Sequence, residues 1–119
     1  MKDFKELKVW QKAHEVTLSL YKISESFPKE EAFGLTSQIK RAAVSVPANI
    51  AEGCGKDSSA ELARFMQISA GSTSELEYHV LLAHDLGFID SKTHQELSSR
   101  IIEVRKMLYA FLKKLKSES

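Results

Sequence analysis

The sequence contains little of what usually punctuates or cross-links a folded chain. Among 119 residues there are one cysteine, two prolines and five glycines. Cys54 has no second cysteine to pair with, so an internal disulfide is excluded. Neither low-complexity segments nor internal repeats are present, which leaves long periodic segments as the main content. A chain of this length can bury a core without a disulfide or a metal, and we expect a single domain over residues 1–119.

Long apolar runs are also absent, and so is an N-terminal signal of the kind that directs secretion. We therefore expect a protein of the cytoplasm that has no membrane partner. The residues that catalysis would need are missing as well. Cys54 has no nearby histidine, and GCGKDS at residues 53–58 lacks both the preceding strand and the Gly-Lys-Ser/Thr ending of a phosphate-binding loop. No catalytic residue is expected, and the protein is predicted not to be an enzyme.

Metal chemistry of the kind found in helix bundles lacks its pattern too. A di-iron site requires inward glutamates and a Glu-x-x-His pair on each of two helices. Here Glu75 and His79 are four residues apart, and no second helix supplies a matching pair. We therefore expect neither a metal site nor a cofactor. His79 is interpreted as a histidine packed in or beside a helix seam and hydrogen-bonded to a neighbouring helix.

Neither sign of charge dominates the chain, which contains 17 basic and 16 acidic residues. This balance conceals a difference between segments. Residues 57–96 contain two basic and seven acidic side chains, whereas residues 97–119 contain six basic and two acidic ones. Most of the excess positive charge is therefore expected on the last helix.

Apolar residues recur at steps of three and four along most of the chain, which predicts helices. Four are expected, at about residues 9–26, 31–54, 58–86 and 90–116. Pro28 ends the first, because the residue before a proline disfavours helical geometry. Acidic residues at 30 and 31 suit the start of the second. The middle of the third, SAGS at residues 69–72, is small and polar, so another helix is expected to approach closely there.

The remaining helix boundaries are predicted from capping residues. Ser58 to Glu61 resembles a capping box at the start of the third helix, and Asp90 or Ser91 is the expected cap of the fourth. The connections between the predicted helices are short, which makes sequence neighbours antiparallel. The predicted fold class is therefore all-α, an antiparallel up-down-up-down four-helix bundle.

The second predicted helix contains the most unusual pattern, SQIKRAAVSVPANIAEG at residues 37–53. Pro47 lies inside an apolar stripe, where its ring removes a backbone donor and frees the carbonyl of Ala43. We expect Asn49 to fill the hydrogen bonds that Pro47 opens, and Glu52 to bond to a basic residue or a helix start. Gly53 and Gly55 are expected to stop the helix. A structural role for this motif is favoured over a functional one.

Basic side chains are the remaining candidates for a binding function. Lys106, Lys113 and Lys114 are expected within a narrow arc of the last helix, where they could follow a phosphate backbone. Charges on the outer face of a bundle are ordinary, however, and the acidic third helix could simply neutralise them. Lys40 and Arg41 could instead make salt bridges between helices or subunits. The candidate nucleic-acid-binding residues are Lys40, Arg41, Arg100, Arg105, Lys106, Lys113, Lys114 and Lys116.

Several large apolar side chains cannot all lie on one four-helix seam. We expect some of them to form an exposed patch that an oligomer would bury, with Trp10 and Tyr78 as the candidate interface residues. The whole set comprises Trp10, Tyr21, Phe33, Phe65, Met66 and Tyr78.

Three blocks of the sequence resemble a known family. FKELKVWQKA near the start, the SQIKRAAVSVPANIAEG segment, and ELEYHVLLAHDLGFI occur in the same order in the four-helix-bundle family encoded by intervening sequences of bacterial 23S ribosomal RNA genes, the S23 family. The resemblance covers about Phe4 to Leu112. In that family the block from Asn49 to Gly53 is a hallmark.

The resemblance also implies an assembly and a partner. Proteins similar to this one, including the accessory proteins of diversity-generating retroelements, form ring-shaped pentamers whose basic surface engages nucleic acid and a reverse transcriptase. The expectation is therefore a homopentamer that binds structured RNA, ribosomal RNA in particular. Fivefold repetition would multiply a weak basic stripe into an avid one. The alternative is an oligomeric scaffold that binds a protein partner and no nucleic acid.

Overall fold

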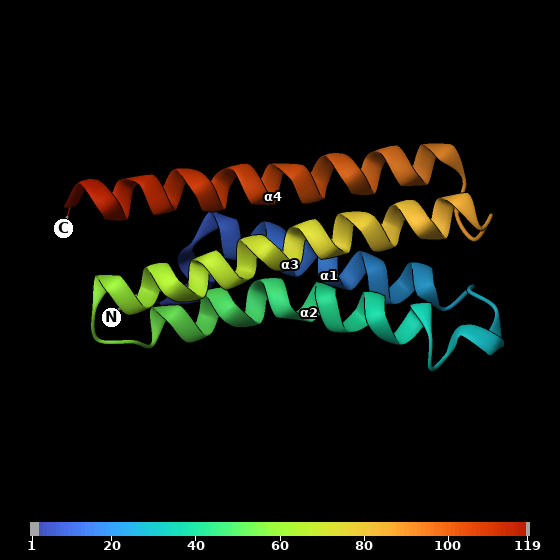
Figure 1. The fold of residues 1–119 in the computed structure, drawn as a ribbon, viewed down its shortest axis with the longest axis horizontal. Helices are drawn as coiled ribbons and strands as arrows, with labels where there is room; N and C mark the ends of the chain where they lie inside the picture. Colours follow the sequence, from blue (N-terminus) through green and yellow to red (C-terminus); the bar gives the residue numbers. More distant parts are fainter. Residues whose placement is uncertain (1–2, 119) are drawn as a thin grey trace.

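Four long helices run in alternating directions in the computed structural model, which describes residues 3–118 (Figure 1). They are α1 (Lys8–Ser24), α2 (Leu35–Cys54), α3 (Ser59–Asp85) and α4 (Ser91–Glu118). Two short 3-10 turns precede α1 and α2, namely η1 (Phe4–Glu6) and η2 (Lys29–Glu31), and the described residues contain no strand. The predicted all-α, up-down-up-down four-helix bundle is confirmed.

The two ends of the bundle contain different segments of the chain. One end contains the α1–α2 and α3–α4 connections, at the right of Figure 1. The other contains the α2–α3 turn, the start of α1 and the end of α4, which is at the left of the same view. We call these the connection end and the α4 end.

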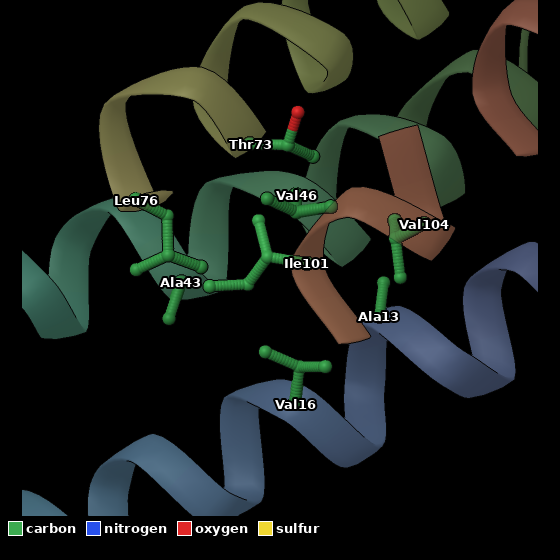
Figure 2. Close-up of a pocket in the computed structure, with 8 residues that line it drawn as sticks. All are labelled: Ala13, Val16, Ala43, Val46, Thr73, Leu76, Ile101 and Val104. Atoms are coloured by element: carbon green, nitrogen blue, oxygen red, sulfur yellow. The ribbon is translucent and has the colours of Figure 1, made fainter. Parts of the chain in front are cut away.

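All four helices contribute equally to the middle of the core (Figure 2). A void of about 10 Å³ there is lined by two residues from each helix. A space of this size accommodates at most one water molecule, so this void is too small for a larger ligand. Figure 2 shows the hydroxyl of Thr73 turned away from the void, which leaves an apolar lining. The lining residues are Ala13, Val16, Ala43, Val46, Thr73, Leu76, Ile101 and Val104.

Buried side chains continue from this middle layer toward both ends. Leu20, Ile39 and Leu97 belong to the cluster of the connection end, and Ile50 and Met66 to that of the α4 end. Phe65 and Met66, two of the large apolar residues that cannot all lie on one seam, are both buried in the core. Within the described residues, no helix is long and apolar enough to cross a membrane.

The start of α2 differs from the prediction. The helix begins at Leu35, not at Glu30 or Glu31, because the residues that follow Pro28 form the 3-10 turn η2 and Gly34 lies outside helical geometry (φ −110°, ψ −117°). Glu31 nevertheless acts on the helix start from outside. Its Oε1 accepts a hydrogen bond from the Leu35 amide at 3.0 Å, which satisfies one of the free amides of the first turn. At the other boundary of this connection, α1 ends at Ser24.

The predicted caps of α3 and α4 are present. Ser58 Oγ accepts a hydrogen bond from the Glu61 amide at 3.1 Å, and Asp90 Oδ1 accepts one from the Thr93 amide at 2.8 Å. The hydrogen bonds from Thr93 lower the pKa of the Asp90 carboxyl, so its charge persists at the positive end of the α4 dipole. The Glu61 carboxylate pairs with Arg64, at 3.0 Å between Oε2 and Nε.

Candidate functional site

The proline inside α2 determines how α1 packs. Pro47 lacks the amide that would bond to the carbonyl of Ala43. Thr17 of α1 supplies the missing donor, because its Oγ1 lies 2.9 Å from the Ala43 carbonyl oxygen. The same hydroxyl lies 2.9 Å from the carbonyl of Ala13 in its own helix. The prediction that Asn49 fills this gap is wrong, since the gap opens toward α1 and the Asn49 side chain lies on another side of α2.

Asn49 instead belongs to the junction of α2 with α3. Its Nδ2 donates to the carbonyl oxygen of Ser45 at 2.8 Å and to Ser45 Oγ at 2.9 Å. Ser45 Oγ in turn lies 2.7 Å from Ser72 Oγ of α3. One layer deeper, the fully buried Ser69 donates to the Val46 carbonyl at 2.8 Å. These hydroxyl groups join the two helices without intervening large side chains.

Of the two predicted stop signals, Gly55 is confirmed and Gly53 has a different role. The helix continues to Cys54, and Gly55 is its C-cap. A Cβ atom on Gly53 would lie 3.0 Å from Phe65 Cβ and 3.1 Å from Leu62 Cδ1, both on α3. Gly53 is therefore required for the close approach of α3. Among the small residues of α3, Ser69 and Ala70 are buried, but Gly71 is exposed with no atom within 4 Å of its potential Cβ, so it does not serve a close approach.

Glu52, which precedes Gly53 in the same segment, is exposed. Its carboxylate contributes to raising the pKa of Arg64, for which the hydrogen bond and charge of Glu61 are the larger causes. This electrostatic contact with Arg64 is weaker than the predicted bond to a basic residue or a helix start. In the structure, Pro47, Asn49 and Gly53 organise helix packing.

His79 is buried as interpreted, with 4% of its surface exposed. The predicted hydrogen bond to a neighbouring helix is wrong, because Nδ1 has no partner among the described residues and Nε2 lies 3.6 Å from Glu75 of the same helix. Burial lowers the pKa of His79, and Glu75 opposes the shift only partly, so the ring is neutral at pH 7. Residues 3–118 contain no cluster of three or more potential ligands placed to hold a metal ion.

Two of the candidate basic residues are engaged inside the bundle. Arg100 Nη1 donates to Ser19 Oγ of α1 at 3.1 Å, and Arg105 Nη1 forms an ion pair with Glu77 of α3 at 2.7 Å. Lys40 and Arg41 lie in the first half of α2, away from the α4 end. Lys40 covers the ring of Tyr21 at 4.9 Å from its centroid, whereas Arg41 is exposed. The structure therefore does not bring all eight candidates together.

Lys113 and Lys114 project to opposite flanks of α4. Lys113 borders a groove shared with α3, and Lys114 borders a groove shared with α1. The predicted narrow arc is wrong for Lys114, because consecutive residues of an α-helix are separated by about 100° around its axis. Lys106 precedes Lys113 by two helical turns and is exposed, so these two share a flank.

The groove between α3 and α4 lies at the α4 end and has a volume of about 390 Å³. We call it the α3–α4 groove. Its Tyr109 is 52% exposed, and its cationic side chains come from both helices. Arg64, Gln67 and Tyr109 were not predicted from the sequence, because they share no motif with the lysines. They would have been indicated by placing the start of α3 beside the end of α4, as antiparallel neighbours require. The lining residues are Ala63, Arg64, Gln67, Tyr109, Leu112, Lys113 and Lys116.

The antiparallel arrangement keeps the basic half of α4 away from most acidic residues of α3. Residues 105–118 contain five basic side chains and one acidic one, and residues 73–90 contain four acidic side chains and no lysine or arginine. The Arg105–Glu77 pair marks where these segments meet. Beyond it, the last turns of α4 lie beside residues 59–72 of α3, which contain only Glu61 and Arg64 as charged groups, and these pair with each other. The third helix therefore does not neutralise the end of α4.

On its other flank, α4 borders a groove of about 320 Å³ shared with the start of α1. It is lined by Met107 and Phe111 of α4, by Leu7 just before α1 and by Val9 of α1, with Lys8 and Lys114 also in the lining. The flank of α4 toward α1 is thus more apolar than the flank toward α3.

The two candidate interface residues differ in exposure. Trp10 is half-buried by its own chain, since its ring stacks on His14 at 4.8 Å and meets Phe4 edge-on at 5.0 Å. Tyr78 is 57% exposed on α3. Of the other large apolar residues singled out from the sequence, Tyr21 and Phe33 are also exposed.

Comparisons with known proteins identify a family and solved structures of similar fold. Residues 5–110 match the family described as 23S rRNA-intervening sequence protein. A crystal structure of a protein of unknown function from the S23 ribosomal protein family of Bacteroides thetaiotaomicron is similar with a TM-score of 0.82. The alignment covers 88% of this chain and 95% of that one at 24% identity, which supports the shared fold. No curated protein matches the sequence.

Proposed function

This chain belongs to the family of 23S rRNA-intervening sequence proteins, and we propose that it is a non-enzymatic, oligomeric four-helix bundle of the cytoplasm that binds structured RNA through the basic side chains at the end of α4. The observation that carries the proposal is the separation of charge between α3 and α4. Lys106, Lys113 and Lys114 form no ion pair within the described residues, although the chain contains nearly as many acidic as basic groups. Unneutralised cations at one end of a nearly neutral protein favour a polyanionic partner.

The oligomeric part of the proposal rests on the family resemblance, which implies a ring of five copies. Exposed apolar side chains such as Tyr78 are compatible with an interface between copies. Repetition matters for affinity, because two or three lysines per copy contribute only weak phosphate binding. Several copies on one RNA convert later contacts into intramolecular ones and raise the avidity.

One preparation suffices to test assembly and RNA binding together. We expect light scattering to give the mass of a pentamer, and a fluorescently labelled stem-loop of ribosomal RNA to bind with an affinity that falls steeply between 50 and 200 mM salt, on the order of tenfold or more. Replacing Lys106, Lys113 and Lys114 by glutamate should weaken binding further and reduce the salt dependence while the fold is retained.

A matched control is available at the connection end. Lys22, Lys29 and Lys92 are exposed there, and replacing these three by glutamate changes the net charge by the same amount. We expect this variant to lose much less affinity than the α4 variant. Equal losses would show that only net charge matters, and unchanged binding in the α4 variant would remove this surface from the proposal. A pentamer indifferent to RNA would favour the protein-binding scaffold.

A further inference from the structure

The α3–α4 groove combines an aromatic ring with cations from two helices. Tyr109 projects from α4 with 52% of its surface exposed, and the ring makes no aromatic or cation contact among the described residues. Lys113 follows one turn later on the same flank, and Lys116 lies in the same lining. Arg64 enters from α3.

The charge of the groove is positive after its internal pairing is taken into account. Arg64 is bound by both carboxylate oxygens of Glu61, at 3.0 and 3.4 Å, so this pair adds little net charge. Lys113, which forms no ion pair within the described residues, remains as the excess cation of the lining. Gln67 offers an amide, a group that both donates and accepts hydrogen bonds.

We propose that the α3–α4 groove receives an unpaired nucleotide of the RNA, with the base stacked on the Tyr109 ring and the adjoining phosphate held by Lys113. This rests on the proposed function and names the part of the RNA that is recognised. A base stacks on an aromatic side chain only when it is free of its neighbours, as in loops, bulges and ends. Bases of every kind have a π-face, so the stacking itself carries no sequence preference.

A duplex does not use these groups in the same way. Its bases are stacked inside the helix, and its phosphates can meet Lys113 without involving the ring of Tyr109. The ring is thus the group that separates the two modes of binding. Gln67 on the opposite wall is positioned in the lining to meet a base edge.

The test compares Tyr109→Ala with Tyr109→Phe on two probes, a labelled single-stranded dodecamer of uridine and a duplex RNA of twelve base pairs. We expect Tyr109→Ala to weaken binding of the single strand by about tenfold, in line with the contribution of one stacked base. Tyr109→Phe keeps the ring and should bind like the unmodified protein. Neither change should affect the duplex. Tyr109 is largely exposed, and circular dichroism of both variants checks that the bundle is retained.

The outcomes separate this inference from the function on which it rests. If the unmodified protein binds neither probe, the proposed function and the inference both fail. If both probes bind and Tyr109→Ala weakens neither, or both equally, RNA binding stands and the stacking of a base is overturned. If Tyr109→Phe loses as much as Tyr109→Ala, the hydroxyl rather than the ring is responsible, which also overturns it. A dodecamer of glutamate that binds as tightly as the single strand would assign the groove to an acidic protein segment.

Discussion

Helices α2 and α4 pack on the same core, but neighbouring helices cover the sides of α2 more completely than the sides of α4. Nine of the 20 residues of α2 are buried, compared with five of the 28 residues of α4. On α2, Thr17 closes the side toward α1, and Ser69 and Ser72 close the side toward α3. On α4, both flanks of the last turns border grooves. Both helices present an apolar stripe to the core. The difference in burial between them therefore arises on their flanks.

Side-chain size explains this difference. Alanine, serine and glycine on α2 let backbones approach closely enough for hydroxyl groups of neighbouring helices to reach main-chain carbonyls. Tyr109, Phe111 and the lysines on α4 are long, and they hold the neighbouring helices apart or extend into solvent. The segment with Pro47 and Gly53 therefore lies on the tightly packed helix α2, whereas the exposed basic and aromatic groups lie on α4. Substitutions that disturb the packing of α2 and substitutions on the flanks of α4 should therefore have different consequences.

The largest effect is expected from closing the contact between α2 and α3 too tightly. In Gly53→Ala the added Cβ would lie 3.0 Å from Phe65 Cβ and 3.3 Å from the Leu62 carbonyl oxygen, so backbone or core atoms must move. We expect the free energy of unfolding to fall by about 1–3 kcal/mol, as for other overpacked sites. Urea denaturation measures the change.

Gly71→Ala is the matched control, because it makes the same substitution inside a helix where nothing lies within 4 Å. Alanine is favoured over glycine in a helix interior, so this variant should gain up to about 1 kcal/mol. A gain at position 53 as well would show that α2 and α3 are not in close contact there, and the comparison between the two helices would lose its main support.

A smaller effect is expected at the junction of α2 with α1. Thr17→Val keeps the shape of the side chain but removes the donor to the carbonyl that Pro47 leaves free, and we expect a loss of about 1–2 kcal/mol in unfolding free energy. Thr73→Val is the control, because Thr73 donates only to Ala70 within its own helix, at 2.6 Å. Its loss should be smaller. If the two losses were equal, Thr17 would have no special relation to Pro47.

The sequence predicts the helices of this bundle better than the contacts between them. Periodicity and capping residues indicate all four helices, and Ser58 and Asp90 cap as expected. The start of α2 is misplaced because a 3-10 turn and an α-helix share the same acidic start signals, and only Gly34 separates them. Local patterns do not contain the information that distinguishes these two conformations.

Contacts between helices depend on register, which periodicity does not provide. From the sequence, Pro47 reveals that the Ala43 carbonyl is free but not that Thr17, 26 residues away, supplies the donor. For the same reason the sequence indicates Lys113 and the lysines near it in the chain as candidate binding residues, but it does not indicate Arg64 on the neighbouring helix or Tyr109. A groove made by two helices becomes visible only when their mutual position is known.

The smallest effect is expected where α4 is joined to α3 by charge. The Arg105–Glu77 pair is short, at 2.7 Å, but its side chains are 22% and 37% exposed, so water and salt screen it. Glu77→Gln should lower the unfolding free energy by only about 0.2–1 kcal/mol, measured by urea denaturation at low salt, because Leu97, Ile101, Val104 and Leu108 still hold α4 on the core. The same substitution releases Arg105 from its partner, so RNA binding should stay constant or increase. A loss of several kcal/mol in unfolding free energy would mean that α4 depends on this pair more than on its apolar stripe. In that case α4 would border grooves on its flanks and would also be only weakly bound to the core.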